Sequence, residues 1–216
     1  MKINEMFYSI QGEGPDIGMP AVFIRTSGCN LNCSWCDTNH EDGVNMSNEE
    51  IISDVLNVQE YRDVPNVVIT GGEPLIQPGI TELILELSRK RIVHVETNGT
   101  IFLPRIIGFC KVIVRPKLAE AASTPDVQEY MLSLSKWVRY ATFKFVVNST
   151  YELLSVAQLI EDIKPKYPVY IMPRCTEANE MKTKLLALTE LIKRKCPSAR
   201  IAPRLQIFLY GNTRGT

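Results

Sequence analysis

Three cysteines in one eight-residue stretch are the residues of this chain most able to do chemistry. Cys29, Cys33 and Cys36 lie in the segment RTSGCNLNCSWCDT with the spacing C-x3-C-x2-C. Glycine and asparagine residues separate them, and these turn formers indicate a loop that wraps around a bound group. Cysteine thiolates are common ligands of zinc and the usual ligands of iron–sulfur clusters. The segment therefore predicts a metal centre.

Two kinds of metal centre compete for this loop. A structural zinc site needs four protein ligands, usually in two separated pairs, and the sequence has no second cysteine pair. His40 or His94 would have to complete it. An iron–sulfur cubane held by three thiolates instead leaves one iron open to an outside ligand. We favour the cluster, and a zinc-stabilised binding module that turns nothing over is the alternative.

The composition is that of an ordinary globular protein. The 216 residues are 45% apolar and 22% charged, with a formal net charge of zero, so we expect one domain over residues 1–216. A nucleic-acid partner is not expected because the chain has no basic stripe. No stretch has the length and apolarity of a membrane span or a signal peptide. We expect a reducing, cytoplasmic location, where clustered cysteines bind metal rather than form disulfides.

Short apolar runs alternate with segments of helical periodicity along the chain. Nearly continuous apolarity predicts strands buried on both faces. The predicted strands are Ala21–Thr26, Asn66–Thr70, Ile92–Glu96, Lys111–Arg115, Thr142–Val147 and Val169–Met172. Such alternation indicates a parallel α/β sheet, either an open doubly wound sheet or a barrel with fewer than eight strands. In both, ligands bind at the carboxyl ends of the strands, where the cysteine loop and Gly71-Gly72 lie.

The predicted helices lie between these strands. Ser47 and Glu50 form a capping-box pattern at the start of one helix, and Thr124-Pro125 is typical of another helix start. Three further sets of apolar residues have helical spacing, and each predicts the buried face of one helix. They are Ile80, Leu83, Ile84 and Leu87; Leu153, Leu154, Ala157 and Ile160; and Leu185, Leu188, Leu191 and Ile192. The scattered Cys110, Cys175 and Cys196 are expected to be buried structural thiols.

The cysteine loop resembles that of the radical S-adenosylmethionine (SAM) superfamily. Its spacing and the aromatic Trp35 before the third cysteine match, as does the sequence Thr70-Gly71-Gly72-Glu73-Pro74 after the second predicted strand. The resemblance implies that the open iron of a [4Fe–4S] cluster binds the amino and carboxylate groups of SAM. It also implies that cleavage of SAM yields a 5′-deoxyadenosyl radical, which removes hydrogen from the substrate.

Further motifs over nearly the whole chain are similar to those of the 7-carboxy-7-deazaguanine synthase family. They are YSIQGEG at 8–14, Arg25, CDT at 36–38, ETNGT at 96–100, RPK at 115–117, PRL at 203–205 and GNTRG at 211–215. The resemblance implies a C–N lyase that converts 6-carboxy-5,6,7,8-tetrahydropterin to 7-carboxy-7-deazaguanine with loss of ammonia, in 7-deazapurine (queuosine-type) biosynthesis. It also implies ring contraction from a radical at C6, with recovery of SAM.

The same resemblance implies the fold and the partners. The fold would be a partial, incomplete TIM-like α/β barrel with about six parallel strands, helices outside, and substrate-binding extensions at both termini. Mg²⁺ is implied as a further cofactor, and a homodimer as the assembly. The partners would be the pterin substrate and an electron donor such as flavodoxin or ferredoxin.

Site residues follow from the matched motifs. Cys29, Cys33 and Cys36 would ligate the cluster, and Thr38 would ligate Mg²⁺, for which a hard oxygen is suited. The residues implied at the SAM site are Trp35, Cys36, Asp37, Gly72, Glu73, Arg115, Pro116 and Lys117. The residues implied at the substrate are Ile10, Gln11, Gly12, Glu13, Arg25 and Thr70. Glu96 has two possible roles from the sequence, capping a loop or binding a ligand.

Two positions depart from the family pattern. Arg115 stands where the family often has serine, which places a bulky cation at a SAM-lining position. Gln206 stands where many members have histidine, and glutamine forms hydrogen bonds but cannot become a cation. No residue is assigned as the acid or base for ammonia loss. Another radical SAM protein, an activase that makes a glycyl radical on a partner enzyme, is the rival function.

Overall fold

A single curved sheet forms the frame of the protein. The structure is a computed structural model that describes residues 1–33, 36, 41–117, 127–211 and 213–216. In these ranges the sheet has nine strands in the order β3-β1-β2-β4-β5-β6-β7-β8-β9. Their bounds are β1 Lys2–Ile10, β2 Pro20–Thr26, β3 Val44–Asn45, β4 Asn66–Gly71, β5 Ile92–Thr97, β6 Cys110–Val114, β7 Ala141–Val147, β8 Tyr170–Pro173 and β9 Arg200–Ile201.

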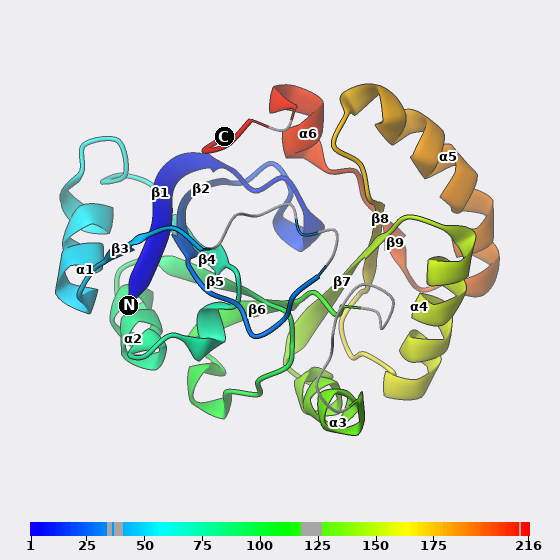
Figure 1. Cartoon of the computed structure of the whole chain (residues 1–216), viewed down its shortest axis with the longest axis horizontal. Coiled ribbons are helices and arrows are strands. Elements are labelled where there is room, and N and C mark those ends of the chain that lie inside the picture. The colour runs from blue at the N-terminus through cyan, green and yellow to red at the C-terminus, as the bar shows by residue number, and fades with distance from the viewer. Residues whose placement is uncertain (34–35, 37–40, 118–126, 212) are drawn as a thin grey trace.

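The strands β2 and β4 to β9 are mutually parallel, whereas β1 pairs antiparallel with both β2 and β3. The sheet curves into an open crescent with helices along its convex side (Figure 1). This is the expected partial barrel. The two-residue strands β3 and β9 were not predicted, because so short a run has no readable periodicity.

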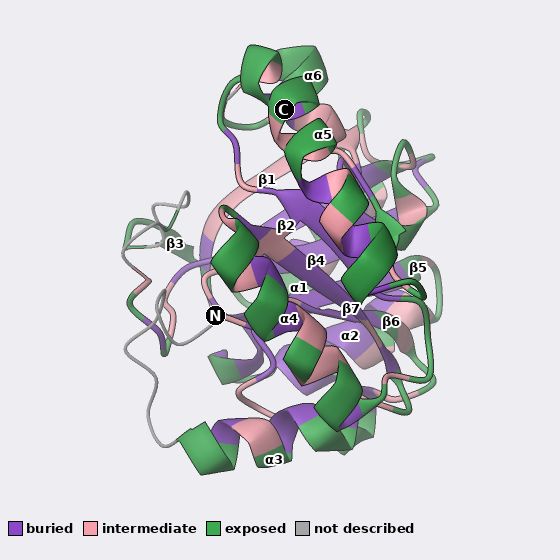
Figure 2. Ribbon diagram, turned by 90° about the vertical axis from the view of Figure 1, so that its right-hand side faces the viewer, coloured by how far each residue is buried: buried purple, intermediate pink, exposed green. Residues whose placement is uncertain are grey.

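The helices cover the outer face of the sheet. They are α1 Asn48–Asn57, α2 Ile80–Ser88, α3 Val127–Trp137, α4 Thr150–Ile163 and α5 Ala178–Lys195, whereas the short α6 Leu205–Tyr210 lies at the open side of the crescent. Three 3-10 turns, η1 Gly14–Asp16, η2 Pro74–Ile76 and η3 Pro104–Ile106, lie in the loops. Figure 2 shows burial concentrated in the strands, with the outer faces of α4 and α5 exposed. None of the helices described is long and apolar enough to cross a bilayer.

The predicted helix signals are mostly confirmed. Ser47 and Glu50 form the reciprocal capping box of α1, and all four apolar residues of the predicted α2 face are buried. The face predicted for α4 was wrong in one position, because Leu154 is exposed and Val156 and Ile163 complete the buried stripe. Thr124-Pro125 lies outside the described residues. Cys175 and Cys196 are buried, while Cys110 is half-buried.

The two faces of the sheet carry different kinds of side chain. Alternate residues of the inner strands, such as Val93 and Val95 of β5, pack with the helices into the main apolar core. The residues between them face the concave side, because successive side chains of a strand point to opposite faces. These include His94 and Glu96 on β5 and Lys144 on β7. These charged and titratable side chains therefore lie on the concave face. α6 and the C-terminal segment lie across the open side of the crescent (Figure 1).

Candidate active site

A cavity of about 310 Å³ opens on the concave face at the carboxyl ends of the strands. The structure brings to its wall all six residues predicted to bind substrate: Ile10, Gln11, Gly12, Glu13, Arg25 and Thr70. They come from β1, the loop after it, β2 and β4, which are adjacent in the sheet. Glu96, Arg115, Arg204 and Gln206 also line the cavity, as do residues of the C-terminal segment.

The loop between β1 and β2 closes one side of the cavity. Gln11 anchors it, since its backbone N–H donates to Met19 O at 2.7 Å and its carbonyl accepts from Gly18 N at 2.7 Å. Position 12 has no room for a side chain, because a Cβ on Gly12 would lie 2.6 Å from the Cδ of Gln206 and 2.8 Å from its backbone N. The Gly12 carbonyl instead accepts from Leu205 N at 2.8 Å. The N-terminal loop and the start of α6 are thus fastened together.

Glu13 is the centre of a buried charge cluster. Its Oε1 accepts from Arg204 Nε at 2.7 Å and from Gln206 Nε2 at 2.8 Å. Its Oε2 lies 2.9 Å from Lys144 Nζ and 4.0 Å from Arg115 Nη2. The Arg204 Nη1 also donates to the Cys175 carbonyl at 2.8 Å. Two sequence-distant segments are therefore joined behind the cavity by charge-assisted hydrogen bonds.

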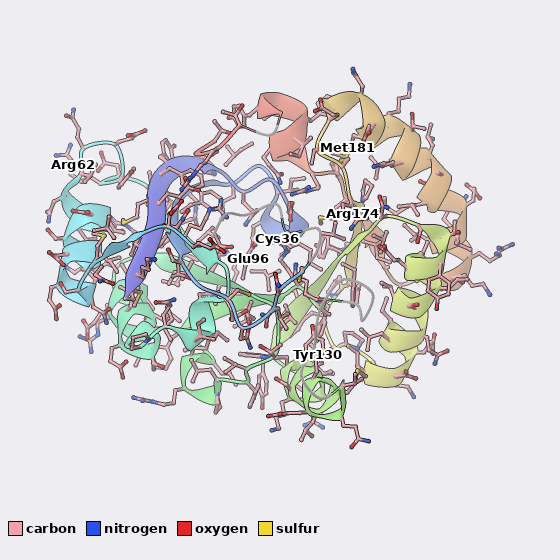
Figure 3. The ribbon with its side chains drawn as sticks, in the orientation of Figure 1. Cys36, Arg62, Glu96, Tyr130, Arg174 and Met181 are labelled. Carbon is pink, nitrogen blue, oxygen red and sulfur yellow. The ribbon has the colours of Figure 1, made fainter. Side chains whose placement is uncertain are left out.

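Glu96 at the end of β5 belongs to the same cluster. Its Oε1 accepts from Lys144 Nζ at 2.8 Å and from Gln11 Nε2 at 3.2 Å. Its Oε2 has longer contacts, 3.5 Å to Thr70 Oγ1 and 3.6 Å to Arg115 Nη1. Figure 3 shows Glu96 in the central region that the sheet encloses. Glu96 thus lines the cavity and also holds the cluster together.

Burial alone would raise the pKa values of both glutamates. The nearby cations together outweigh burial: Lys144, Arg204 and Arg115 hold the pKa of Glu13 well below its ordinary value of 4.5, and Lys144 and Arg115 lower that of Glu96. A lowered pKa in the folded state means stability that is present above the unfolded value and is lost as the pH falls through the folded one. The charge cluster therefore stabilises the fold at neutral pH, and this stabilisation is lost only in acid.

Glu13→Gln is expected to lower the free energy of unfolding at pH 7 by about 3 kcal/mol, because it leaves buried cations without their partner. The difference from the wild type should start to shrink below about pH 4, where Glu13 takes up a proton in the unfolded state, and vanish as the pH falls through the lowered pKa of the folded state. Urea unfolding at pH 7, 5 and 3 measures it. Glu190→Gln, on the exposed face of α5, is the control with little effect at any of these pH values. A deficit that is constant with pH would contradict the charge role of Glu13.

Arg25 is held in a fixed orientation at the cavity wall. Its Nε donates to Glu5 Oε1 at 2.7 Å, and its guanidinium lies 5.7 Å from the centre of the Phe7 ring. Glu5 also accepts from Arg214 Nε at 2.9 Å, which fastens the C-terminal segment over the cavity. The planar guanidinium has further donors suited to a carboxylate. The structure thus places Arg214, of the GNTRG motif, on the cavity wall.

The cysteine loop leaves the end of β2 beside this cavity. Cys29 Sγ accepts from Leu31 N at 3.4 Å and from Asn98 Nδ2 at 3.9 Å, and Cys36 N donates to Cys33 O at 3.1 Å. Burial raises the pKa of Cys29, and the nearby Cys33 and Cys36 add to this rise. Among the residues that the structure describes, no three His, Cys, Asp or Glu side chains are arranged to hold a metal ion.

The Gly-Gly-Glu-Pro segment after β4 packs directly on the start of the cysteine loop. Gly72 N donates to Thr26 O at 3.1 Å and Glu73 N donates to Gly28 O at 2.9 Å. A Cβ on Gly72 would overlap the Gly28 carbonyl, 2.6 Å from its carbon. Only glycine allows this approach of the two backbones. The segment therefore sets where the cysteine loop begins.

Glu73 accepts hydrogen bonds from three groups of the chain itself. Its carboxylate is completely buried and accepts from Leu75 N at 3.0 Å, Thr97 Oγ1 at 2.8 Å and Asn98 N at 2.6 Å. Burial raises its pKa to about 7 against the effect of these hydrogen bonds. In this structure Glu73 joins the loops after β4 and β5, and a contact with SAM stays a prediction.

Sequence comparisons identify related proteins over the full chain. The sequence model of the radical SAM superfamily matches residues 23–115. A 7-carboxy-7-deazaguanine synthase from Pyrobaculum aerophilum is 35% identical over 226 residues, which cover 100% of this chain and 97% of that protein. One from Rhodopirellula baltica is 34% identical and covers 99% of this chain and 88% of that protein.

This chain belongs to the 7-carboxy-7-deazaguanine synthase family. The fold agrees with a solved structure, that of QueE from Escherichia coli, with a TM-score of 0.70, 24% identity and coverage of 94% of this chain and 93% of that one. The synthase family lies within the radical SAM superfamily, which implies a [4Fe–4S] cluster and SAM.

The donors of the cysteine loop fit such a cluster. Three thiols are available on one loop, Cys36 is exposed, and Cys29 and Cys33 are half-buried. The cation Lys117 lies near enough to Cys33 to oppose the rise that burial gives its pKa. A nearby positive charge favours the thiolate, which is the form that binds iron. Trp35, Asp37 and Thr38 lie outside the described residues.

The other predicted SAM residues of this synthase-family chain follow β6. Arg115 lies between the cavity glutamates and a second cavity of about 360 Å³, which it shares with Arg204, Arg174 and Lys184. Lys117 N donates to Tyr130 Oη at 2.8 Å, and that hydroxyl donates to Asn98 O at 2.9 Å. Tyr130, on α3, thus fixes two loops of the rim; Figure 3 shows it below Glu96.

Lys144, Arg204 and Glu5 were not assigned a site role from the sequence. Lys144 had a signal, because it is the one charged residue in the otherwise apolar strand segment ATFKFVV. Arg204 stood in a family motif without a role, and Glu5 had no distinguishing pattern. Gln206, noted as a departure from the family, has a buried Oε1 without a hydrogen-bond partner in the described part of the chain. These residues meet only through the folding of distant segments.

Proposed function

We propose that this protein is a 7-carboxy-7-deazaguanine synthase. It converts 6-carboxy-5,6,7,8-tetrahydropterin to 7-carboxy-7-deazaguanine with loss of ammonia. The observation that carries the proposal most is the similarity to the Pyrobaculum aerophilum synthase, which extends over 100% of this chain and 97% of that protein. The cavity supports it, because its size and polar lining suit a small heterocycle that bears a carboxylate.

The charges on the cavity wall complement this substrate. Four arginines (Arg25, Arg115, Arg204, Arg214) stand against three glutamates (Glu5, Glu13, Glu96) in the lining. This arginine-rich wall suits a substrate with a carboxylate, and Arg25 is the residue proposed to pair with it. Gln11, Glu13 and Thr70 are proposed to bind the polar edge of the pterin, with the backbone of Ile10 and Gly12 beside them.

Cys29, Cys33 and Cys36 would hold the cluster, and Gly72, Glu73 and the 115–117 segment would border SAM. When bound, the cluster and SAM supply the radical that removes a hydrogen atom from the substrate. The chain's own part is to orient the pterin against that radical source and to exclude water. The short connection between the Gly72 backbone and the cysteine loop keeps the two ligand sites in a fixed relation.

Mg²⁺ is proposed as a further ligand, bound through Thr38 and the substrate carboxylate, where it would hold the substrate for ring contraction. Thr38→Ala is expected to raise the Mg²⁺ concentration needed for half-maximal rate by about tenfold. Initial rates over a Mg²⁺ titration measure this, with Thr189→Ala on α5 as the control. An unchanged Mg²⁺ response would remove Thr38 from the site.

The proposal extends to the assembly and the surroundings of the protein. Residues 1–216 are proposed to form a single radical SAM domain in which the segments before β2 and after β9 are substrate-binding extensions. A homodimer is proposed, together with an electron donor such as flavodoxin or ferredoxin. Clustered cysteines that bind metal, as proposed for this loop, suit the reducing cytoplasm.

Anaerobic reconstitution with iron and sulfide tests the proposed function. We expect a brown protein with broad absorbance near 400 nm, about four irons per chain, and turnover of the carboxytetrahydropterin in the presence of SAM. A colourless protein that binds one zinc would instead support a zinc-stabilised binding module. Cluster-loaded protein that consumes SAM only with a partner enzyme would support a glycyl-radical activase.

A further inference from the structure

A lysine without solvent exposure lies behind the wall of the proposed substrate cavity. Lys144 is in the middle of β7, between Phe143 and Phe145, which pack in the main core on the other face of the sheet. Its side chain is 0% exposed, and its Nζ lies 2.9 Å from Glu13 Oε2 and 2.8 Å from Glu96 Oε1. The ammonium thus joins two carboxylates that both line the cavity.

A buried lysine of this kind gains little net stability for the fold. Removing a cation from water has a large desolvation cost, and apolar replacements of buried ion pairs often leave a protein equally or more stable. Lys144 instead matters for the ionisation of the two glutamates. Neighbouring buried carboxylates repel each other. With only the longer Arg115 contacts left between them, 4.0 Å to Glu13 and 3.6 Å to Glu96, one takes up a proton more readily. A protonated carboxyl has lost acceptor sites that an ionised one offers.

We infer that Lys144 is a positioning residue, which holds Glu13 and Glu96 side by side as hydrogen-bond acceptors for the substrate. The inference rests on the proposed function, because a pterin edge presents ring N–H and amino donors to such acceptors. Glu96 has capacity for them, since its Oε2 has only the 3.5 Å and 3.6 Å contacts to Thr70 and Arg115 among the described residues. Lys144 fixes the other oxygen of Glu96 and so the direction of the carboxylate.

The remaining charged and titratable groups around the pair come from neighbouring elements. Arg115 approaches from the end of β6 and Arg204 from the start of α6. His94, one layer below Glu96 on β5, is bound to Asp16 of η1 with 3.3 Å between Nδ1 and Oδ2. All of these groups remain when Lys144 is replaced. A pH response that depends on Lys144 is therefore separable from theirs.

The test is binding of 6-carboxypterin, a fluorescent oxidised analogue of the proposed substrate, to the purified full chain between pH 5 and 7.5. Over this range the ligand carboxylate stays ionised. The variants are Lys144→Met and Lys144→Gln, each also combined with Glu96→Gln. Lys193→Met is the matched control, because it breaks a lysine–glutamate pair of 2.8 Å on the exposed face of α5. Circular dichroism reports whether each variant is folded.

We expect the wild type and Lys193→Met to bind with equal affinity and with little dependence on pH. Lys144→Met and Lys144→Gln should bind at least tenfold more weakly at pH 7, and their affinity should fall further towards pH 5. Adding Glu96→Gln should remove that pH dependence, because one carboxylate no longer has another to repel. Lys144 variants that fold only when Glu96→Gln is added would show the same charge pairing and would support the inference.

Lys144 variants with wild-type affinity and pH dependence would overturn the inference, as would an unfolded variant that Glu96→Gln does not restore. A uniform loss of affinity without any pH response would overturn it too, because that result would show a purely structural role for Lys144. Failure of the wild type itself to bind 6-carboxypterin would contradict the proposed function instead. The two failures are thus distinguishable in one set of titrations.

Discussion

Replacement of any one of Cys29, Cys33 or Cys36 by alanine is expected to abolish turnover and to leave the fold in place. Each thiol is one of only three proposed ligands of the cluster, so its loss leaves a second iron without a protein ligand. The three side chains lie on a loop outside the main core and contribute little to packing. Iron content after anaerobic reconstitution, turnover and circular dichroism are the measurements.

Cys110→Ala is the matched control for these variants. Cys110 is half-buried at the start of β6, and burial raises its pKa to about 12, so it remains a thiol at neutral pH. We expect this variant to keep its iron and its activity. Undiminished turnover in any of the three loop variants would count against the proposed cluster.

Gly72→Ala is expected to reduce turnover by about a hundredfold, the order of loss that follows when reacting groups are displaced by an ångström. A Cβ at this position would overlap the Gly28 carbonyl and lie 3.0 Å from Cys29 Cβ. Backbone atoms cannot move aside as a flexible side chain can. The start of the cysteine loop must therefore shift away from the 71–74 segment, and the cluster with it.

Gly108→Ala is the control for the glycine substitution. Gly108 has a left-handed φ of +88°, but a Cβ there would meet no atom within 4 Å beyond the adjacent residues of the described chain. The cost is therefore a backbone strain of about 1 kcal/mol. This variant should lose a little stability and no activity. Gly72→Ala with the wild-type iron content and rate would show that the contact with Gly28 does not position the loop.

The parallel strands could be predicted from the sequence because each is a short apolar run with a clear end. Phe143 and Phe145 face the helices while the concave face keeps small or apolar residues such as Phe23 and Val68. Both faces are therefore buried, and the runs are nearly continuous. The antiparallel β1 has many half-buried positions and mixed polarity, so it was not among the predicted strands.

The motif residues of the site were assigned through the family resemblance, and their roles stay predictions. Gln11, Gly12 and Glu13 follow a strand within a glycine-rich turn, and the structure places them on the same cavity as Arg25 and Thr70. What the sequence could not show is the pairing across long separations. Glu13 meets Arg204 over 191 positions of the chain, and no local pattern at either residue encodes this contact.

The most direct test of the proposed activity is the ratio of 7-carboxy-7-deazaguanine formed to SAM consumed, measured anaerobically on cluster-loaded protein with 6-carboxy-5,6,7,8-tetrahydropterin. We predict many product molecules and released ammonia for each SAM lost. Consumption of SAM without the deazaguanine product, or one SAM lost for every product molecule, would contradict the ring contraction with recovery of SAM that is proposed for this chain.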